Sequence, residues 1–224
     1  LYILGEIWHT SQPWLQGDEF HAVMNYPLSE SIKDYFLRQN KKAEQFISEI
    51  NSQSMYYKQQ ISEVMFNLLD SHDTERILTT AKGNIQHVKS ALTFLYLQKG
   101  APCIYYGTEL ELIGGPDPDC RRVMPWDRVS EDNDMLNFMK QLIQVRKEVA
   151  SIIQHGTYKL EEVKSDVLAL NWSYEGKEVQ AIFNQSPENY ILDRDSVDLA
   201  SHCQFEDGQQ VILPDGFVVY LDSI

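Results

Sequence analysis

Four short apolar runs, separated by segments with helical periodicity, constrain the fold of this chain more than any other feature. The runs cover residues 1–4, 20–26, 64–69 and 101–107. Each is rich in β-prone residues and is closed by glycine, proline or polar residues, as expected for strands of a buried sheet. Strands that alternate with helices predict an α/β fold with a parallel sheet. Four such units amount to half of a (β/α)8 TIM barrel.

The segments between these runs predict the helices. Apolar residues recur at helical spacing over residues 43–50, 85–98 and 133–153. Ser29 stands where an N-cap would begin a further helix, with apolar residues following it at the same spacing.

The pattern of apolar and turn-forming residues changes after Gly156. Short β-prone runs then alternate with turns, over residues 167–172, 179–184, 211–213 and 217–221. This spacing is typical of antiparallel all-β structure. We therefore predict two parts, a half-barrel over residues 1–154 and a small antiparallel β-sandwich domain over residues 155–224.

Charge and cysteine content exclude several classes of protein. The 224 residues carry a formal net charge of −14, which repels phosphate backbones and argues against binding to nucleic acid or an anionic membrane. No apolar run approaches the ~20 residues that a membrane span needs. Cys103, Cys120 and Cys203 form no C-x-x-C pair, which makes a zinc site a weak hypothesis. An odd number of cysteines without a signal peptide predicts a reduced, cytoplasmic protein.

Polar residues follow the predicted strands at the points where a barrel places its chemistry. Glu6 ends the first predicted strand, and His72 and Asp73 follow the third. Because the carboxyl ends of barrel strands share one face, we expect these side chains to converge on one cleft. Two acids on one cleft suggest general acid–base chemistry on a neutral polyol or sugar.

Four ordered motifs carry a resemblance to a known family. They are "YILGEIWH" (2–9), "AVMNYPL" (22–28), "LLDSHDTERIL" (68–78), and "GAPCIYYGTE" followed by "GGPDPDCRRVMPWD" (100–127). In these motifs the chain resembles the α-amylase family, glycoside hydrolase family 13, and within it the neopullulanase, cyclomaltodextrinase and maltogenic amylase subgroup. The resemblance covers essentially the whole chain. It implies that the chain corresponds to barrel strands five to eight followed by the C-terminal β domain.

The resemblance also implies roles for the polar residues. Glu6 would be the general acid/base, Asp73 would stabilise the transition state, and His72 would donate a hydrogen bond to the same sugar. Such enzymes retain anomeric configuration and need a nucleophilic carboxylate about 5–5.5 Å from the acid. In the family that nucleophile belongs to an R-x-D motif on the fourth barrel strand, which lies outside this chain. We therefore expect the isolated chain to be inactive, to need the N-terminal half of the same polypeptide as its partner, and to self-associate through exposed barrel edges.

Further site residues are less distinctive. Trp8 and Trp14 are predicted to stack on sugar rings, with packing in the core as the alternative. Arg121 is predicted to bind substrate, with a salt-bridged loop as the alternative. Asp117 and Asp119 lie in a loop rich in glycine and proline where Ca²⁺ is an open alternative, but two carboxylates do not define a site. No metal and no required cofactor are therefore predicted.

These expectations define a predicted function. The parent protein would be a retaining hydrolase that cleaves α-1,4 bonds, with α-1,6 bonds as a further alternative, in α-glucans such as maltodextrins, cyclodextrins or pullulan. Two alternatives stay open, a sugar-binding module without catalysis and a transglycosylase of the same family. Thr108 stands where the family often has aspartate, which bears on substrate preference.

Overall fold

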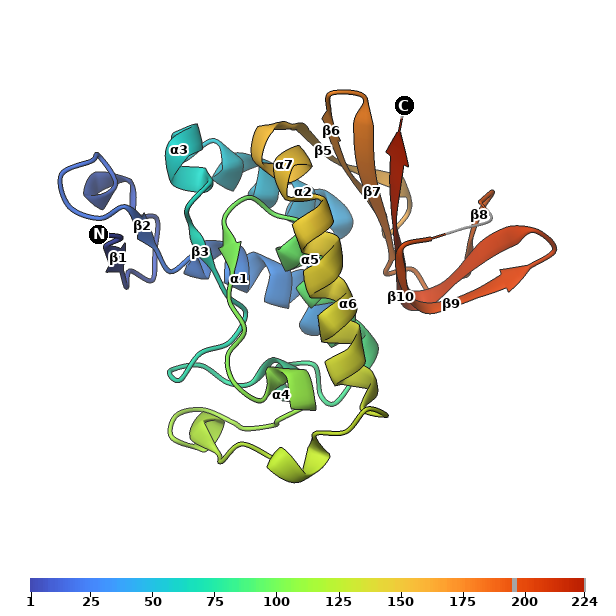
Figure 1. Ribbon diagram of the computed structural model, residues 1–224, viewed down its shortest axis with the longest axis horizontal. Coiled ribbons are helices and arrows are strands. Elements are labelled where there is room, and N and C mark those ends of the chain that lie inside the picture. Colours follow the sequence, from blue (N-terminus) through green and yellow to red (C-terminus); the bar gives the residue numbers. More distant parts are fainter. Residues whose placement is uncertain (195–196, 224) are drawn as a thin grey trace.

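The first part of the molecule is a half-barrel of four short parallel strands. The computed structural model describes residues 1–194 and 197–223 (Figure 1). The strands are β1 (Leu4–Gly5), β2 (Ala22–Val23), β3 (Phe66–Asn67) and β4 (Ala101–Pro102). β1 pairs with β2, β3 pairs with β4, and a parallel bridge between Met24 and Phe66 joins the two pairs. The strands are thus neighbours in chain order, as the α/β interpretation predicts.

The paired strands are shorter than the apolar runs that predicted them. Leu68 and Leu69 continue the run of β3 and stay buried, although the ladder ends at Asn67. Gly100 lets β4 approach β3 closely. Its φ of +102° is left-handed, and a Cβ atom there would lie 2.6 Å from the Met65 carbonyl oxygen.

Helices cover the outer side of the half-barrel, and several of them differ from prediction. They are α1 (Tyr26–Ile32), the π-helical η2 (Lys33–Leu37), α2 (Ala43–Ser54), α3 (Gln59–Ser62), α4 (Ile77–Thr80), α5 (Ile85–Tyr96), α6 (Asp134–Glu148) and α7 (Ala150–His155). Ser29 is not an N-cap, because α1 begins three residues earlier, with Pro27 in its first turn. The single helix predicted over 133–153 is two, and the Asn133 side chain caps the first by accepting from the Leu136 amide at 2.8 Å. In the described part of the chain no helix combines the length and apolar character that crossing a bilayer requires.

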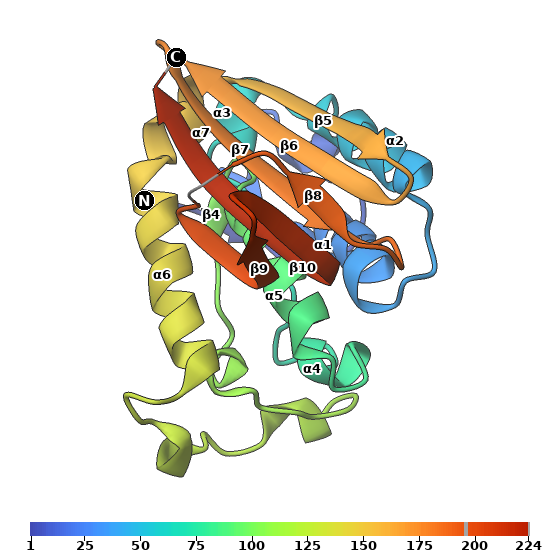
Figure 2. The same ribbon diagram turned by 90° about the vertical axis from the view of Figure 1, so that its right-hand side faces the viewer.

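The second part is antiparallel β structure, as predicted. Its strands are β5 (Thr157–Lys164), β6 (Val167–Tyr174), β7 (Lys177–Asn184), β8 (Tyr190–Leu192), β9 (Leu199–Glu206) and β10 (Gln209–Ser223). Figure 2 shows these strands from the side away from the half-barrel. Hydrogen bonds join them in the order β5-β6-β7-β10-β8, and β9 also pairs with β10.

The two layers of this part arise within one hydrogen-bonded sheet. The register of β10 shifts between Ile212 and Phe217, so its first half pairs with β8 and β9 and its second half with β7 and β9. Residues of β8 and β9, including Leu192 and Cys203, therefore pack on Ile182 and its neighbours on the outer face of the sheet.

One hydrophobic core joins the two parts. Phe36 of η2 and Phe94 of α5 lie 5.4 and 5.9 Å from Phe183 of β7, measured between ring centroids, and Phe217 of β10 lies 5.8 Å from Phe183. All four rings are fully buried. The inner face of the sheet thus anchors the helices that position the half-barrel strands.

Candidate active site

Tyr26 contacts one of the two acids that the sequence singled out and lies near the other. It is 2% exposed, and its hydroxyl donates to Glu6 Oε1 at 3.4 Å. Burial raises the pKa of Tyr26 to about 12; the Ser71 hydroxyl opposes this shift, whereas the charges of Glu6 and Asp73 add to it. One buried phenol is therefore close enough to both carboxylates to respond to their charge, although 67 positions separate them in the sequence.

His72 and Arg121 both contact the carboxylate of Asp73. His72 Nε2 lies 3.2 Å from Asp73 Oδ2, and Arg121 Nη2 lies 3.2 Å from Asp73 Oδ1. Arg121 Nε also donates to the His72 carbonyl oxygen at 2.9 Å. The side chains of His72 and Asp73 remain 54% and 32% exposed, so both are open to solvent.

The loop that carries Arg121 is held by ion pairs. Arg121 Nε lies 2.7 Å from Asp117 Oδ1, and Arg122 Nη2 lies 2.7 Å from Asp119 Oδ2. Both aspartates considered for Ca²⁺ therefore already have cationic partners. Across residues 1–194 and 197–223, no group of three or more histidine, cysteine, aspartate or glutamate side chains is arranged to hold a metal ion.

The two predicted stacking residues have different surroundings. Trp8 lies on Tyr26, with ring centroids 3.8 Å apart and planes 9° from parallel, and it is 52% exposed. Trp14 ends the short 3₁₀ helix η1 (Gln12–Trp14), where its ring lies 5.5 Å from that of His9. In the part of the chain that is described, no aromatic, hydrogen-bonding or ionic contact joins Trp14 to Glu6, Tyr26 or Asp73.

Asp70 lies beneath the His72–Asp73 loop and was not predicted as a site residue. It is 5% exposed, it accepts from the Thr108 hydroxyl at 3.0 and 3.2 Å, and it accepts from the Ile77 amide at 3.4 Å. Burial raises the pKa of Asp70 to about 6, against the opposing charge of Arg76 and the Thr108 hydrogen bonds. Asp70, and not Asp73, therefore contacts the amide at the start of α4.

The buried Arg76 holds together the loops that contain Tyr106 and Cys120. It is fully buried, its Nε donates to the Cys120 carbonyl oxygen at 2.7 Å, and its Nη1 donates to the Tyr106 carbonyl oxygen at 2.6 Å. Its guanidinium carbon lies 3.9 Å from the centre of the Tyr105 ring. Because Cys120 directly precedes Arg121, Arg76 helps to fix the loop that reaches Asp73.

Comparison with known proteins places this geometry in a family. The model of the α-amylase catalytic domain matches residues 1–144. The chain belongs to the α-amylase family. This confirms the family predicted from the four motifs.

Members of the predicted subgroup are among its relatives. The chain is 44% identical over 187 residues to the intracellular maltogenic amylase of Bacillus subtilis, which covers 83% of this chain and 32% of that protein. It is 48% identical over 158 residues to a cyclomaltodextrinase of a Bacillus species, covering 70% and 28%. It also matches a solved cyclomaltodextrinase structure with a TM-score of 0.82 and 35% identity, over 97% of this chain and 40% of that one. The α-amylase fold predicted from the sequence is thereby confirmed, and the chain spans about a third of the length of the curated relatives it matches.

Proposed function

We propose that this α-amylase-family chain is part of a retaining hydrolase of α-glucans, in which Glu6 is the general acid/base. The observation that carries the proposal is the position of Tyr26. Its hydroxyl donates to Glu6, and it lies close enough to Asp73 for that negative charge to add to the rise in its pKa. Carboxylates gathered at the carboxyl ends of barrel strands are the usual machinery for cleaving a glycosidic bond.

Each residue has a role in the proposed reaction. Glu6 protonates the glycosidic oxygen as the bond to the leaving sugar breaks, and it later removes a proton from the water that releases the product. Asp73 and His72 hold hydroxyl groups of the sugar at the cleavage point and stabilise the positive charge that develops on its ring. The nucleophilic carboxylate comes from a segment outside these 224 residues.

Trp8 and Arg121 would act on substrate binding. Trp8 offers a half-exposed ring beside Glu6, suited to stacking on a sugar. Arg121 holds Asp73 and the His72 backbone in place, and its side chain is 45% exposed toward solvent. Trp14 remains a predicted sugar-stacking residue, at a position that makes no contact with Glu6 or Asp73 among the described residues.

We further propose that the chain works within a longer polypeptide. The matched relatives are about two and a half times its length. Leu1, Tyr2, Ile3 and Leu4 are all exposed. Among the described strands, β1 and β4 each have one partner, which leaves two open sheet edges of the kind that completing strands would cover. The isolated 224-residue chain would then be inactive and would self-associate, and the name of the Bacillus subtilis relative favours an intracellular location.

Substitution of Glu6 tests the proposal directly. In the complete gene product, Glu6→Gln should abolish turnover of an aryl maltoside, whereas Glu19→Gln, a change of the same kind at an exposed position, should leave it intact. Near-normal rates for Glu6→Gln would refute the assignment. A gene that encodes no R-x-D motif upstream of Leu1 would instead favour the non-catalytic sugar-binding module.

Product analysis separates the two enzymatic alternatives. A hydrolase yields only shorter sugars from maltohexaose. A transglycosylase also yields chains longer than the substrate.

A further inference from the structure

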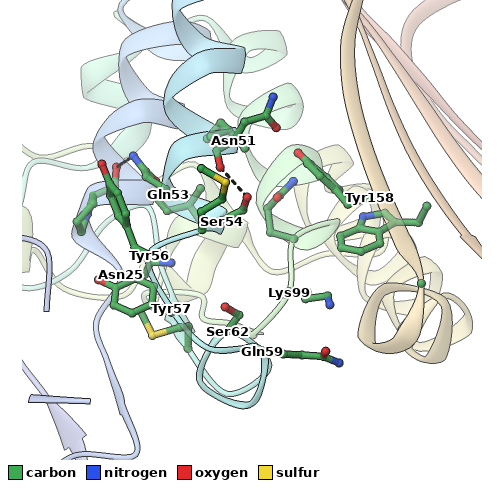
Figure 3. Close-up of a pocket in the computed structure, with 18 residues that line it drawn as sticks. Asn25, Asn51, Gln53, Ser54, Tyr56, Tyr57, Gln59, Ser62, Lys99 and Tyr158 are labelled. Carbon is green, nitrogen blue, oxygen red and sulfur yellow. Dashed lines mark hydrogen bonds between the residues drawn. The ribbon is translucent and has the colours of Figure 1, made fainter. Parts of the chain in front are cut away.

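A cavity of about 590 Å³ is lined by none of Glu6, His72, Asp73 and Arg121, although Asn25 and Pro27 in its lining flank Tyr26. It is open to solvent and is lined by Asn25 and the first turn of α1, by the C-terminal end of α2, by α3 and by residues of β5 and β6 (Figure 3). Met65 and Lys99, which precede β3 and β4, also line it. The cavity is therefore near the amino ends of these strands, whereas His72 and Asp73 come after the carboxyl end of β3 in the chain. Its volume is within the range of about 300–1,000 Å³ that small-molecule sites occupy.

The lining of this cavity favours a neutral polar ligand. None of its 18 residues is aspartate or glutamate, although the chain contains 33 acidic residues, and the one charged lining residue is Lys99. Five of the lining residues are carboxamides: Asn25, Asn51, Gln53, Gln59 and Gln98. Carboxamides both donate and accept hydrogen bonds, which suits hydroxyl groups that do the same.

Two buried oxygen atoms of the lining lack partners. The Gln53 amide nitrogen donates to Ser31 Oγ at 2.9 Å and to the Pro27 carbonyl oxygen at 3.3 Å, but Gln53 Oε1 accepts from no described residue. The Tyr158 hydroxyl also has no partner of hydrogen-bonding geometry, although the Gln98 amide is close enough to oppose the rise in its pKa that burial causes. Leaving such groups unsatisfied costs about 1–3 kcal/mol each. Both atoms are covered by neighbouring protein groups, so they add unpaired polar groups behind the lining without facing the cavity directly.

Aromatic rings supply the apolar part of the lining. Tyr56 stands at the rim with 40% of its surface exposed, and Tyr57 is next to it. Deeper in the cavity, the rings of Tyr158 and Trp172 lie 4.7 Å apart at an angle of 54°. A sugar ring offers C–H groups to aromatic faces and hydroxyl groups to amides, so it matches both halves of the lining.

We propose that this cavity is a second binding site, separate from the catalytic cluster, for a neutral oligosaccharide of the α-glucan class. The choice of α-glucan rests on the proposed function, whereas the preference for a neutral polyol rests on the lining itself. A chain of glucose units held here would keep other parts of the same polymer at high local concentration near the catalytic cleft.

The methionine residues allow both sites to be observed in one experiment. Met55 and Met65 line the cavity, whereas Met24 accepts a weak hydrogen bond from Tyr26 at 4.0 Å beside Glu6. Isotope-labelled methionine methyl groups would be followed by NMR while maltohexaose is added to the Glu6→Gln complete gene product. We expect saturable shifts of Met55 and Met65 with an affinity different from that reported by Met24.

Two substitutions test the site and the charge of its ligand. Ser54→Trp should fill the mouth of the cavity and weaken the Met55 and Met65 response at least about tenfold. Ser48→Trp, an exposed position of α2 outside the lining, should leave that response unchanged. Lys99→Gln should preserve maltohexaose binding within about twofold, because a neutral ligand does not need the ammonium group.

Each result decides between the proposals. The absence of Met55 and Met65 shifts at concentrations that saturate Met24 would overturn the second site and leave the proposed function standing. Shifts that persist in Ser54→Trp would also overturn it, and loss of binding in Lys99→Gln would refute the neutral ligand. A response of Met55 and Met65 without one of Met24 would support the second site and contradict the proposed catalytic cleft.

Discussion

Both carboxylate oxygens of the buried Asp70 accept a hydrogen bond from the Thr108 hydroxyl, at 3.2 and 3.0 Å. Resemblance to the family implies aspartate at position 108 in many members, and a second carboxylate at this place would face Asp70. Threonine offers a donor without a charge. It therefore lowers the cost of the single acid buried beneath the His72–Asp73 loop.

Asp70 should make stability fall as pH rises. Because burial raises the pKa of Asp70 to about 6, the native state binds this proton more tightly than the unfolded state, whose carboxyl titrates near 3.9. The stabilising contribution is complete below about pH 4 and is lost as pH rises through about 6. Two pKa units correspond to about 3 kcal/mol. In urea unfolding, the stability of Asp70→Asn relative to wild type should improve by up to that amount between about pH 4 and pH 7.

Thr108→Val gives the matched control for this prediction. It removes the donor that favours ionised Asp70 and so raises the native pKa further, which means that its stability should begin to fall at the same pH of about 4, but should keep falling to a higher pH than that of wild type. A difference between Asp70→Asn and wild type that does not change with pH would show that Asp70 does not titrate in this range.

In the complete gene product, Tyr26→Phe should reduce turnover while leaving the fold intact. The ring that stacks on Trp8 is retained, but the hydroxyl that orients Glu6 is lost. Loss of one hydrogen bond to a charged group, at about 1.4 kcal/mol, corresponds to a roughly tenfold lower kcat on maltodextrin. Steady-state assays of reducing-sugar release would measure this, with KM changing less than kcat. An unchanged kcat would remove Tyr26 from the site.

The placement of Glu6 after β1 and of His72 and Asp73 after β3 could be predicted because it depends on a local rule. Residues that follow parallel barrel strands share one face, and the motifs mark where each strand ends. Burial of a charged side chain follows no local rule. Asp70 finds its donor 38 residues away, and these distant partners are absent from any window of sequence.

Neither the start of α1 nor the cavity lined by Met55 and Met65 could be predicted from the sequence, for related reasons. Tyr26 was assigned to the end of a strand, but Pro27 in the first turn starts a helix there, and this turns the phenol toward Glu6. The cavity draws its lining from α2, α3, β5 and β6, which only the packed core brings together.

Arg121→Ala should weaken substrate binding more than it weakens the fold. Its ion pairs with Asp73 and Asp117 involve a side chain that is 45% exposed, so their loss should cost at most about 1 kcal/mol of stability. Without Arg121, Asp73 and His72 should hold the sugar less well, so KM of the complete gene product should rise by roughly three- to tenfold. Arg122→Ala is the control, because Arg122 pairs with Asp119 in the same loop. Equal KM values for the two variants would argue against a role for Arg121.

The shared core predicts that the half-barrel and the β domain unfold together. Phe183 of the sheet contacts Phe36 and Phe94 of the helices, and all three rings are fully buried. Phe183→Ala should lower the free energy of unfolding by about 3–5 kcal/mol, through lost burial and the cavity left behind. Ile191→Ala, at a position of β8 that is 59% exposed, should change it by less than about 0.5 kcal/mol. In hydrogen exchange, the amides of α5 and β7 should lose protection together in Phe183→Ala. Loss of protection in β7 alone would mean that the two parts are independent folding units.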